Sequence, residues 1–259
     1  MCKISIVMPV YNGEMFVKDA IESTLQQSFD DFEFIIVDDG STDKTLSIIR
    51  SYKDKRIKLI ENKHDFIGSL NLGMNTAQGT YIARMDADDV MHIDRLKIQY
   101  AIMEENPTIT VCGTWMKCFG ENIQPAISRA PSGLIETPLL KLTMGCFMSH
   151  PTVMIRTDFL RKHGLMYDKN YVYAEDFKFW LEIAKKGGVF YVEPQPLMFY
   201  RISDQQVSTQ KREEQTAKTK IIIQQAIDYL VEKNEEEYPE LFVVFQGLNK
   251  LQEKELITT

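Results

Sequence analysis

The stretch YIARMDADDV, residues 81–90, runs from strand-forming residues directly into three carboxylates, Asp86, Asp88 and Asp89. Crowded carboxylates repel one another, so a folded chain gains little stability from placing them together. If the extended backbone continues past Met85, Asp86 and Asp88 point to one side of the chain and Asp89 to the other. Asp89 is left open as a residue that only leads into the next helix. Two carboxylates on one side suit Mg²⁺ or Mn²⁺, whose shell is completed by water and substrate phosphates. The stretch therefore predicts a site for a divalent cation and a phosphate ligand.

Upstream of this stretch, apolar runs alternate with helical patterns. The first run, ISIVMPV, is nearly continuous and suits a strand that is buried on both faces. The order strand–helix is then repeated up to the stretch itself, which is the fourth strand. We expect an α/β fold with a mostly parallel central sheet flanked by helices. The predicted elements are strands in ISIVMPV, FEFIIVDD, RIKLIEN and TYIARMD, and helices over 14–28, 42–52 and 67–77, the second capped by Ser41 or Thr42.

Polar residues follow three of these strands. Tyr11 and Asn12 follow the first, Asp38 and Asp39 end the second, and the acids of residues 86–89 follow the fourth. Open parallel sheets bind ligands at the carboxyl ends of their strands, so these residues are expected on one rim. The turn PVYNGE contains a single glycine, which argues against a dinucleotide-binding dehydrogenase.

The second half of the chain has a different pattern of predicted helices and strands. The segment EDFKFWLEIAKKGG predicts a helix with acids at its start, lysines at its end and Gly187 as its C-cap. VFYVEPQPLMFYRIS predicts two short strands broken by Pro194 and Pro196. From about Arg212 onward the chain reads as a helix, with Ile223, Ile227 and Leu230 expected on one face, followed by an amphipathic segment, LFVVFQGLNKL.

Composition narrows the class of protein. The chain has 259 residues, of which 44% are hydrophobic and 26% charged, as in ordinary globular proteins. Its formal net charge of −7 argues against a nucleic-acid partner. No apolar run approaches the roughly 20 residues of a membrane span, and no signal peptide is evident. We expect a cytoplasmic protein, with peripheral contact at the inner face of the membrane left open.

The motifs VMPVYN, FIIVDDGSTD, GTYIARMDADD, SHPTVMIR and YAEDFKFWLEIAKKG together resemble family 2 glycosyltransferases with the GT-A fold, of the type that builds bacterial surface polysaccharide and lipopolysaccharide. The resemblance covers roughly residues 3–205, and five motifs in register are far more specific than DxD alone. It implies a catalytic domain over 1–205, with a nucleotide-binding half over about 1–110 and an acceptor half over about 111–205. Residues 206–259 would form a C-terminal helical extension.

The resemblance also implies how the donor nucleotide is held. Tyr11 matches the aromatic residue that stacks on the base, and the backbone of Pro9 would line the base pocket. Asp39 matches the acid that hydrogen-bonds the base. A carboxylate accepts from the ring N–H of uracil, which cytosine lacks, so a UDP-sugar is the expected donor. Asp38 is left open as a residue that supports the turn.

Asp86 and Asp88 match the DxD motif of the family. Asp88 would ligate a Mg²⁺ or Mn²⁺ ion that bridges the diphosphate, and Asp86 would assist it or reach the ribose or sugar. Arg84 would contact the donor or balance the acids. Where many relatives carry a histidine after a Tyr-Arg pair, this chain has Ser203, a poor ligand, so the phosphate contact is assigned instead to Arg201 or Gln206.

The implied reaction is inverting glycosyl transfer, in which an acceptor hydroxyl attacks the anomeric carbon as the diphosphate leaves. Asp176 matches the family's general base, and Glu175 would orient the acceptor. A carboxylate at a helix N-terminus is expected to stay ionised. His150 matches a position near the acceptor and the phosphates, and a purely structural role for it is left open.

Several alternatives remain at this point. A non-catalytic GT-A-like module that binds nucleotide sugar, or acts as a scaffold, is supported by Ser203. A sugar nucleotidyltransferase is disfavoured because YNGEMFVKD lacks a glycine-rich basic phosphate loop. The acceptor is expected to be a glycan or a lipid-linked glycan. The C-terminal helices are expected to pack on their own domain, in preference to a membrane or a second copy of the chain.

Overall fold

The computed structural model describes residues 2–121, 123–129, 131–203 and 211–236, and four single positions beyond them (243, 246, 247 and 250). These residues form one ten-stranded sheet, in which eight strands follow the order β3-β2-β1-β4-β9-β6-β10-β5. β7 pairs with β6 and β8 with β10. The strands are β1 (Ile4–Val10), β2 (Phe32–Asp38), β3 (Ile57–Glu61), β4 (Tyr81–Arg84), β5 (Val90–Met91), β6 (Val111–Phe119), β7 (Ala126–Ser128), β8 (Gly133–Ile135), β9 (Met154–Arg156) and β10 (Phe190–Arg201).

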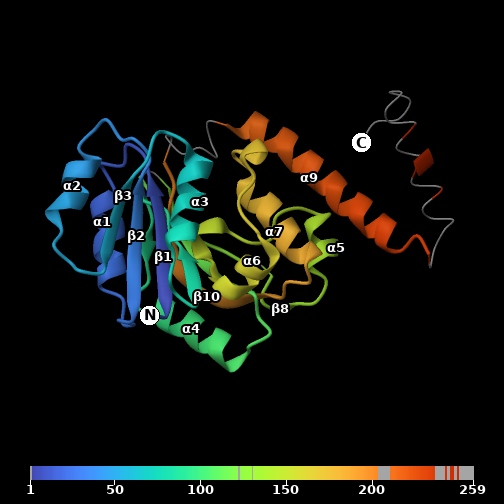
Figure 1. Cartoon of the computed structure of the whole chain (residues 1–259), viewed down its shortest axis with the longest axis horizontal. Helices are drawn as coiled ribbons and strands as arrows, with labels where there is room; N and C mark the ends of the chain where they lie inside the picture. Colours follow the sequence, from blue (N-terminus) through green and yellow to red (C-terminus); the bar gives the residue numbers. More distant parts are fainter. Residues whose placement is uncertain are drawn as a thin grey trace.

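Helices cover both faces of this sheet, which confirms the predicted α/β class. β1, β2 and β3 stand between α1 and α2 on one side and α3 on the other (Figure 1). The helices are α1 (Val17–Leu25), α2 (Thr45–Ser51), α3 (Phe66–Thr76), α4 (Arg95–Glu105), α5 (Pro138–Leu142), α6 (Thr157–His163), α7 (Glu175–Lys185) and α9 (Arg212–Lys233), with short 3₁₀ turns η1 (His150–Thr152) and η2 (Lys169–Tyr171).

The first half is a parallel, doubly covered sheet. β1 pairs in parallel with β2 and with β4, and β2 pairs in parallel with β3. Alternate side chains of β1 divide between two hydrophobic cores: Val7 packs with α3, while Ile6 and Met8 pack with α1 and α4. Both faces are therefore buried, which is why this strand is a continuous apolar run instead of an alternating one.

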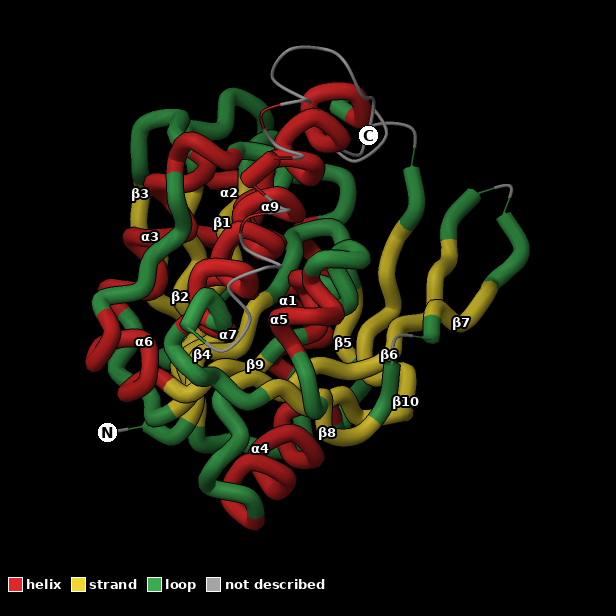
Figure 2. The backbone as a smooth tube through the Cα atoms, turned by 90° about the vertical axis from the view of Figure 1, so that its right-hand side faces the viewer, coloured by secondary structure: helices red, strands yellow, loops and turns green. Residues whose placement is uncertain are grey.

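The second half adds antiparallel pairs to the sheet. β9 lies between β4 and β6 and is antiparallel to both. β6 and β10 are parallel but lose register between Glu193 and Pro196. Our prediction of two short strands over this segment was wrong, because the two prolines sit in an irregularity of one long strand, where their missing N–H groups break no regular ladder. Figure 2 shows β7 at the margin of the molecule beside β6.

The C-terminal helix α9 packs on the second half of the domain. It runs diagonally over α7 and contacts α5 (Figure 1). Its fully buried side chains are Ile222 and Ala226, one position before the predicted Ile223 and Ile227, which are only partly buried. Most of LFVVFQGLNKL lies outside the described residues. In the part of the chain that the structure describes, no helix is long and apolar enough to cross a membrane.

The cap predicted before α2 also differs. The helix begins at Thr45, and neither Ser41 nor Thr42 caps it. Ser41 Oγ instead accepts a hydrogen bond from Asn12 N (3.0 Å), and Thr42 N donates to Asn12 Oδ1 (2.8 Å). These bonds connect the loop after β1 to the loop after β2. Ser41 and Thr42 take part in this connection, and neither of them caps α2.

Gly79, just before β4, provides a test of this packing. A Cβ at this position would lie 2.6 Å from Ser5 N and 2.8 Å from Ile4 C, both backbone atoms of β1. Gly79→Ala should therefore reduce the free energy of unfolding by about 2 kcal/mol, measured by urea denaturation. Gly247→Ala, where a Cβ meets nothing within 4 Å, is the control. Equal stability of the two variants would contradict the close approach of Gly79 to β1.

Candidate active site

The polar residues predicted on one rim do meet there. Val10 pairs with Asp38, and Val7 pairs with Arg84, so the ends of β1, β2 and β4 lie side by side. The backbone continues this contact, because Asp39 N donates to Val10 O (2.8 Å) and Met85 N donates to Val7 O (3.1 Å). Parallel pairing therefore brings three loops to one edge of the sheet.

Tyr11 and Asp39 flank one side of this edge. The Tyr11 side chain is 47% exposed, so it is not a core tyrosine, and its ring stacks on His64 with centroids 4.0 Å apart. Asp39 is buried, and its Oδ1 accepts from Asp65 N (2.8 Å) and Ser69 Oγ (2.6 Å). Asp39 Oδ2 receives no hydrogen bond from the residues that the structure describes, but it lies 3.1 Å from His64 Nδ1.

His64 was not singled out from the sequence. Its ring stacks on Tyr11 and faces the Asp39 carboxylate, the two contacts that the resemblance assigned to a nucleotide base. A histidine in a polar loop carries no sequence pattern that announces this position. Asp38, by contrast, does what was expected of a turn residue, since its Oδ2 accepts from Ser41 N (3.2 Å). Pro9 lies buried in β1 beside Val37.

The backbone after β4 does not stay extended. Residues 87 and 88 form a turn, and Asp89 N lies 3.4 Å from Asp86 O. The interpretation of Asp89 as the entry to a helix was wrong: β5 follows it, and its fully buried carboxylate accepts from Arg201 N (2.8 Å). Burial, together with the charges of Asp86 and Asp88, raises the pKa of Asp89 well above its ordinary value. All three acids therefore belong to one charged cluster.

Arg84 is the cation that forms an ion pair with this cluster. It ends β4, its side chain is only 4% exposed, and its Nη2 lies 2.6 Å from Asp86 Oδ1. Its Nη1 also donates to Met85 O. The positive charge lowers the pKa of Asp88, Asp89 and both acids of α7 against the effect of their burial. Of the two roles left open for Arg84, balancing the acids is the one that these contacts describe.

The Asp86–Asp88 pair has the chemistry of a divalent-cation site. Burial first, and then the charge of Asp86, raises the pKa of Asp88 to about 6. No ion pair within the described residues reaches Asp88. The charges of Arg201 and Arg84 offset the repulsion only in part, and a cation bound to the oxygens of Asp88 would relieve it further. In the same part of the chain, no three His, Cys, Asp or Glu side chains are grouped to hold a metal. A two-carboxylate site suits Mg²⁺ or Mn²⁺, because water and phosphate oxygens supply the other ligands.

Glu175 and Asp176 are the first two residues of helix α7, and the charge of Arg84 acts on both of them. Burial, and then the charge of Asp176, raises the pKa of Glu175 to about 8. Burial is also the main cause that raises the pKa of Asp176 to about 6, and the charge of Asp86 adds to it. The expectation that the helix dipole keeps these groups fully ionised was therefore too simple.

His150 and Arg201 are held by structural contacts. His150 Nε2 hydrogen-bonds Tyr167 Oη (2.7 Å), and burial lowers its pKa well below the ordinary value, so it is neutral. Arg201 Nε donates to Asp88 O (2.7 Å) and its Nη2 to Asp19 Oδ2 (2.9 Å). Its guanidinium also lies on the rings of Phe16 and Phe119. Arg201 thus anchors the acidic loop, while Gln206 lies outside the described residues.

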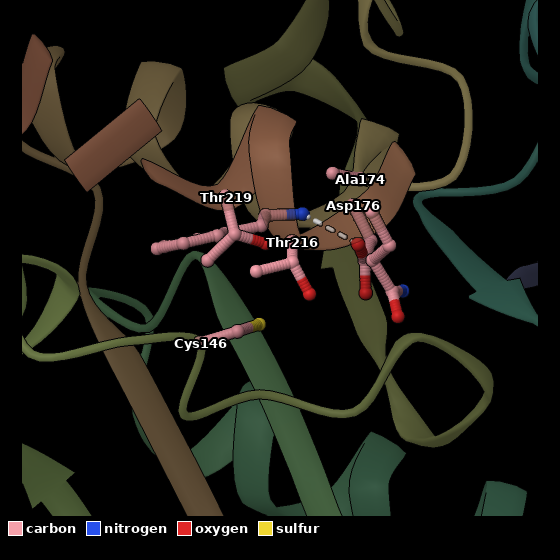
Figure 3. Close-up of a pocket in the computed structure, with 7 residues that line it drawn as sticks. Cys146, Ala174, Asp176, Thr216 and Thr219 are labelled. Atoms are coloured by element: carbon pink, nitrogen blue, oxygen red, sulfur yellow. Dashed lines mark hydrogen bonds between the residues drawn. The ribbon is translucent and has the colours of Figure 1, made fainter. Parts of the chain in front are cut away.

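A pocket opens beside Asp176. It has a volume of about 310 Å³ and is bounded by the start of α7, the loop at Cys146 and one face of α9. Figure 3 shows Asp176 and Cys146 facing Thr216 and Thr219 of α9 across this space. The α9 residues were not predicted as part of a site, because a polar helix face in a sequence is normally a solvated surface.

This chain belongs to the glycosyltransferases of family 2: the profile described as "Glycosyl transferase family 2" matches residues 5–164. An "Uncharacterized glycosyltransferase" of Haemophilus influenzae is 35% identical over 242 residues, which cover 89% of this chain and 75% of the relative. A more distant relative from Escherichia coli is 28% identical and covers 82% of this chain and 81% of its own length. It is named "UDP-Glc:alpha-D-GlcNAc-diphosphoundecaprenol beta-1,3-glucosyltransferase WfgD".

Solved structures confirm the GT-A-type fold. The structure of S. aureus TarS 1-349 in complex with UDP-GlcNAc matches 92% of this chain and 73% of its own, with a TM-score of 0.72 and 21% identity. The mannosyltransferase PcManGT of Pyrobaculum calidifontis, in complex with GDP-Man and Mn²⁺, matches 92% of this chain and 72% of its own. Its TM-score is 0.66 at 16% identity. At these identities the likeness concerns the fold alone.

Removing the Arg84 cation should destabilise the protein in a pH-dependent way. Without it, the buried acids repel one another more strongly, and the cost grows as pH rises and they ionise. Arg84→Met should therefore lose on the order of 1–2 kcal/mol more unfolding free energy at about pH 8 than at about pH 5. Urea denaturation at the two pH values measures this difference. Arg50→Met, at an exposed arginine paired with Glu61, should show no such difference. A pH-independent loss in Arg84→Met would contradict the role of Arg84 in balancing the acids.

Proposed function

We propose that this protein is an inverting glycosyltransferase that moves a sugar from a UDP-sugar to a hydroxyl of a glycan or lipid-linked acceptor. One observation carries the proposal. Asp86, in the loop after β4, and Asp176, at the start of α7, are far apart in the sequence, yet they lie close enough for the charge of Asp86 to raise the pKa of Asp176. This proximity supports the proposal, because a single displacement requires a phosphate-side acid and a base in one site.

The base pocket would be the space between Tyr11 and Asp39. Asp39 Oδ1 is already bonded, so Oδ2 is the oxygen that remains to accept the uracil N–H. His64 now lies against this oxygen and stacks on Tyr11, so the base takes its place when His64 swings out. The His64 side chain is 61% exposed, which leaves room for that movement. The TarS complex with UDP-GlcNAc supports a UDP donor by analogy of fold.

Asp88 and Asp86 would hold a Mg²⁺ or Mn²⁺ ion that neutralises the leaving diphosphate when bound. The PcManGT complex with Mn²⁺ supports this choice of metal. Arg84 holds Asp86 in place through its 2.6 Å ion pair, and Arg201 holds the backbone of Asp88 through a 2.7 Å hydrogen bond. The two arginines therefore fix the acidic loop in position before the donor arrives.

Asp176 would be the general base. The acceptor oxygen forms a bond to the anomeric carbon, its proton passes to Asp176, and the bond from that carbon to the diphosphate breaks with its electron pair leaving on the diphosphate. Asp176 Oδ1 accepts from Phe177 N (2.7 Å), which fixes the orientation of the carboxylate. Glu175, whose raised pKa keeps it protonated near neutral pH, adds no second charge beside the base.

The acceptor is proposed to be lipid-linked. Leu140 in α5 and Met144 just after it are 55% and 85% exposed. They precede Cys146, which lines the pocket next to Asp176. An apolar stretch leading to a polar pocket suits a sugar carried on a lipid. The name of the Escherichia coli relative, which acts on a diphosphoundecaprenol-linked sugar, supports the same class of acceptor.

Asp88→Ala should abolish the metal dependence of UDP binding and turnover without unfolding the domain. No ion pair in the described part of the chain involves Asp88, and removing its carboxylate also removes part of the charge repulsion, so stability should not fall. Calorimetric titration with UDP, with and without Mn²⁺, measures the effect, together with UDP release from candidate UDP-sugars. Asp30→Ala, at a carboxylate that is 93% exposed, is the control. If wild type binds no UDP in either condition, the proposed function fails.

Asp176→Asn should leave UDP binding nearly intact and lower transfer by about 10²- to 10⁴-fold, the usual contribution of a general base. In the wild type, kcat/KM should fall as pH drops through about 6, because the base is protonated below its raised pKa. A pH–rate profile checks this limb. Transfer at the wild-type rate in Asp176→Asn would show that the base lies elsewhere. UDP binding without any turnover in the wild type would favour the non-catalytic module.

A further inference from the structure

The two walls of the pocket beside Asp176 differ in polarity. One wall consists of Ala174, Phe177 and the Cys146 thiol, which are largely apolar. The other is a face of α9 that presents Gln215, Thr216 and Thr219. Figure 3 shows the threonine side chains directed into the space that Asp176 also faces. A sugar ring likewise has an apolar face and a polar edge that consists of hydroxyls.

The side chains of the polar wall can form further hydrogen bonds. Thr216 Oγ1 donates to Arg212 O (2.7 Å), so its oxygen remains as an acceptor. Gln215 Nε2 donates to Tyr173 O (2.8 Å), which leaves its Oε1 as a second acceptor. The Thr219 hydroxyl makes no hydrogen bond with any residue that the structure describes. Sugar hydroxyls both donate and accept, and they match this mixture.

The charge of the pocket disfavours anionic ligands. None of its seven lining residues carries a positive charge, so a phosphate or a carboxylate would gain no partner and would be repelled by Asp176. The lining also contains neither Arg84 nor the acids of the β4 loop, where the donor diphosphate is proposed to bind. The pocket therefore lies on the acceptor side of Asp176. Its volume of about 310 Å³ is at the small end of ligand sites.

Helix α9 also fixes the backbone that carries Asp176. Tyr173 has a φ of 75°, in the left-handed region that a non-glycine residue rarely adopts. Gln215 holds its carbonyl, and Lys218 Nζ donates to the carbonyl of Val172 (3.0 Å). The segment leading into α7 is thus held in an uncommon conformation by the helix that forms the polar wall.

We propose that the pocket between the start of α7 and α9 binds a neutral sugar residue of the acceptor, with Thr216 and Thr219 hydrogen-bonding its hydroxyls beside Asp176. The assignment to the acceptor rests on the proposed function. The sugar lies on the apolar wall and presents one hydroxyl to Asp176. Because α9 follows residues 5–164, which the family profile matches, acceptor choice is set by a part of this chain outside that match.

The test removes the two hydroxyls at nearly constant shape with the double variant Thr216→Val/Thr219→Val. The control is Thr76→Val in α3, whose hydroxyl bonds Leu72 O (2.8 Å) in the same way that Thr216 bonds Arg212 O. The probes are methyl glycosides of glucose, galactose, mannose and N-acetylglucosamine. Saturation-transfer NMR measures their binding in the presence of UDP and Mn²⁺, and calorimetry measures UDP binding by each variant.

We expect at least one glycoside to bind the wild type and the Thr76→Val control equally. Its affinity should fall about tenfold for each hydroxyl removed in the double variant. UDP affinity should be unchanged in all three proteins. Equal glycoside binding by the double variant and wild type would overturn the inference, and so would a wild type that binds UDP but no glycoside. A protein that binds a glycoside through these threonines but no UDP would retain this sugar site while the proposed function fails.

Discussion

The buried guanidinium of Arg84 is the interaction on which the site depends. It lies at the end of β4, pairs with Asp86 at 2.6 Å, and lowers the pKa of four further carboxylates, two in the loop after β4 and two in the first turn of α7. Without a fixed cation, the folded chain would have to protonate these acids or separate them. Arg84 and the nearby Arg201 are together still insufficient, since the pKa of Asp88 remains raised to about 6. This residual repulsion is the physical reason to infer a second, exchangeable cation.

The acidic loop after β4 is held from the far end of the sheet. Asp89 accepts from the backbone of Arg201, at the end of β10, and the Arg201 side chain donates back to the carbonyl of Asp88. The guanidinium is itself packed between Phe16 and Phe119 and paired with Asp19. Strands β1, β4, β6 and β10 therefore all contribute, directly or through their following residues, to the position of one short loop. These contacts hold the loop in one position, as a site that orients its ligands requires.

Much of the first half of the chain was predictable because its signals are local. Strand patterns, the order of elements and the carboxyl-edge rule placed Tyr11, Asp39 and Asp86 on one rim, and the structure brings them there. The errors arose where a distant partner decides the conformation. Asp89 was misread because its partner is Arg201, and the prolines at 194 and 196 were misread because β6 supplies the pairing that keeps β10 one strand. His64 gave no signal, since its neighbours Tyr11 and Asp39 come from two other loops.

By itself, the sequence determined the class of fold, the family resemblance and the identity of the crowded acids in YIARMDADDV, because periodicity and short motifs are properties of neighbouring residues. Only the tertiary structure decided how those acids are used. It turned the chain after Met85, buried Asp89 against β10 and left Asp88 without an ion-pair partner among the described residues. It also set the threonines of α9 across a pocket from Asp176. Charge repulsion and burial act through space, and those distances exist only once the sheet and its helices have assembled.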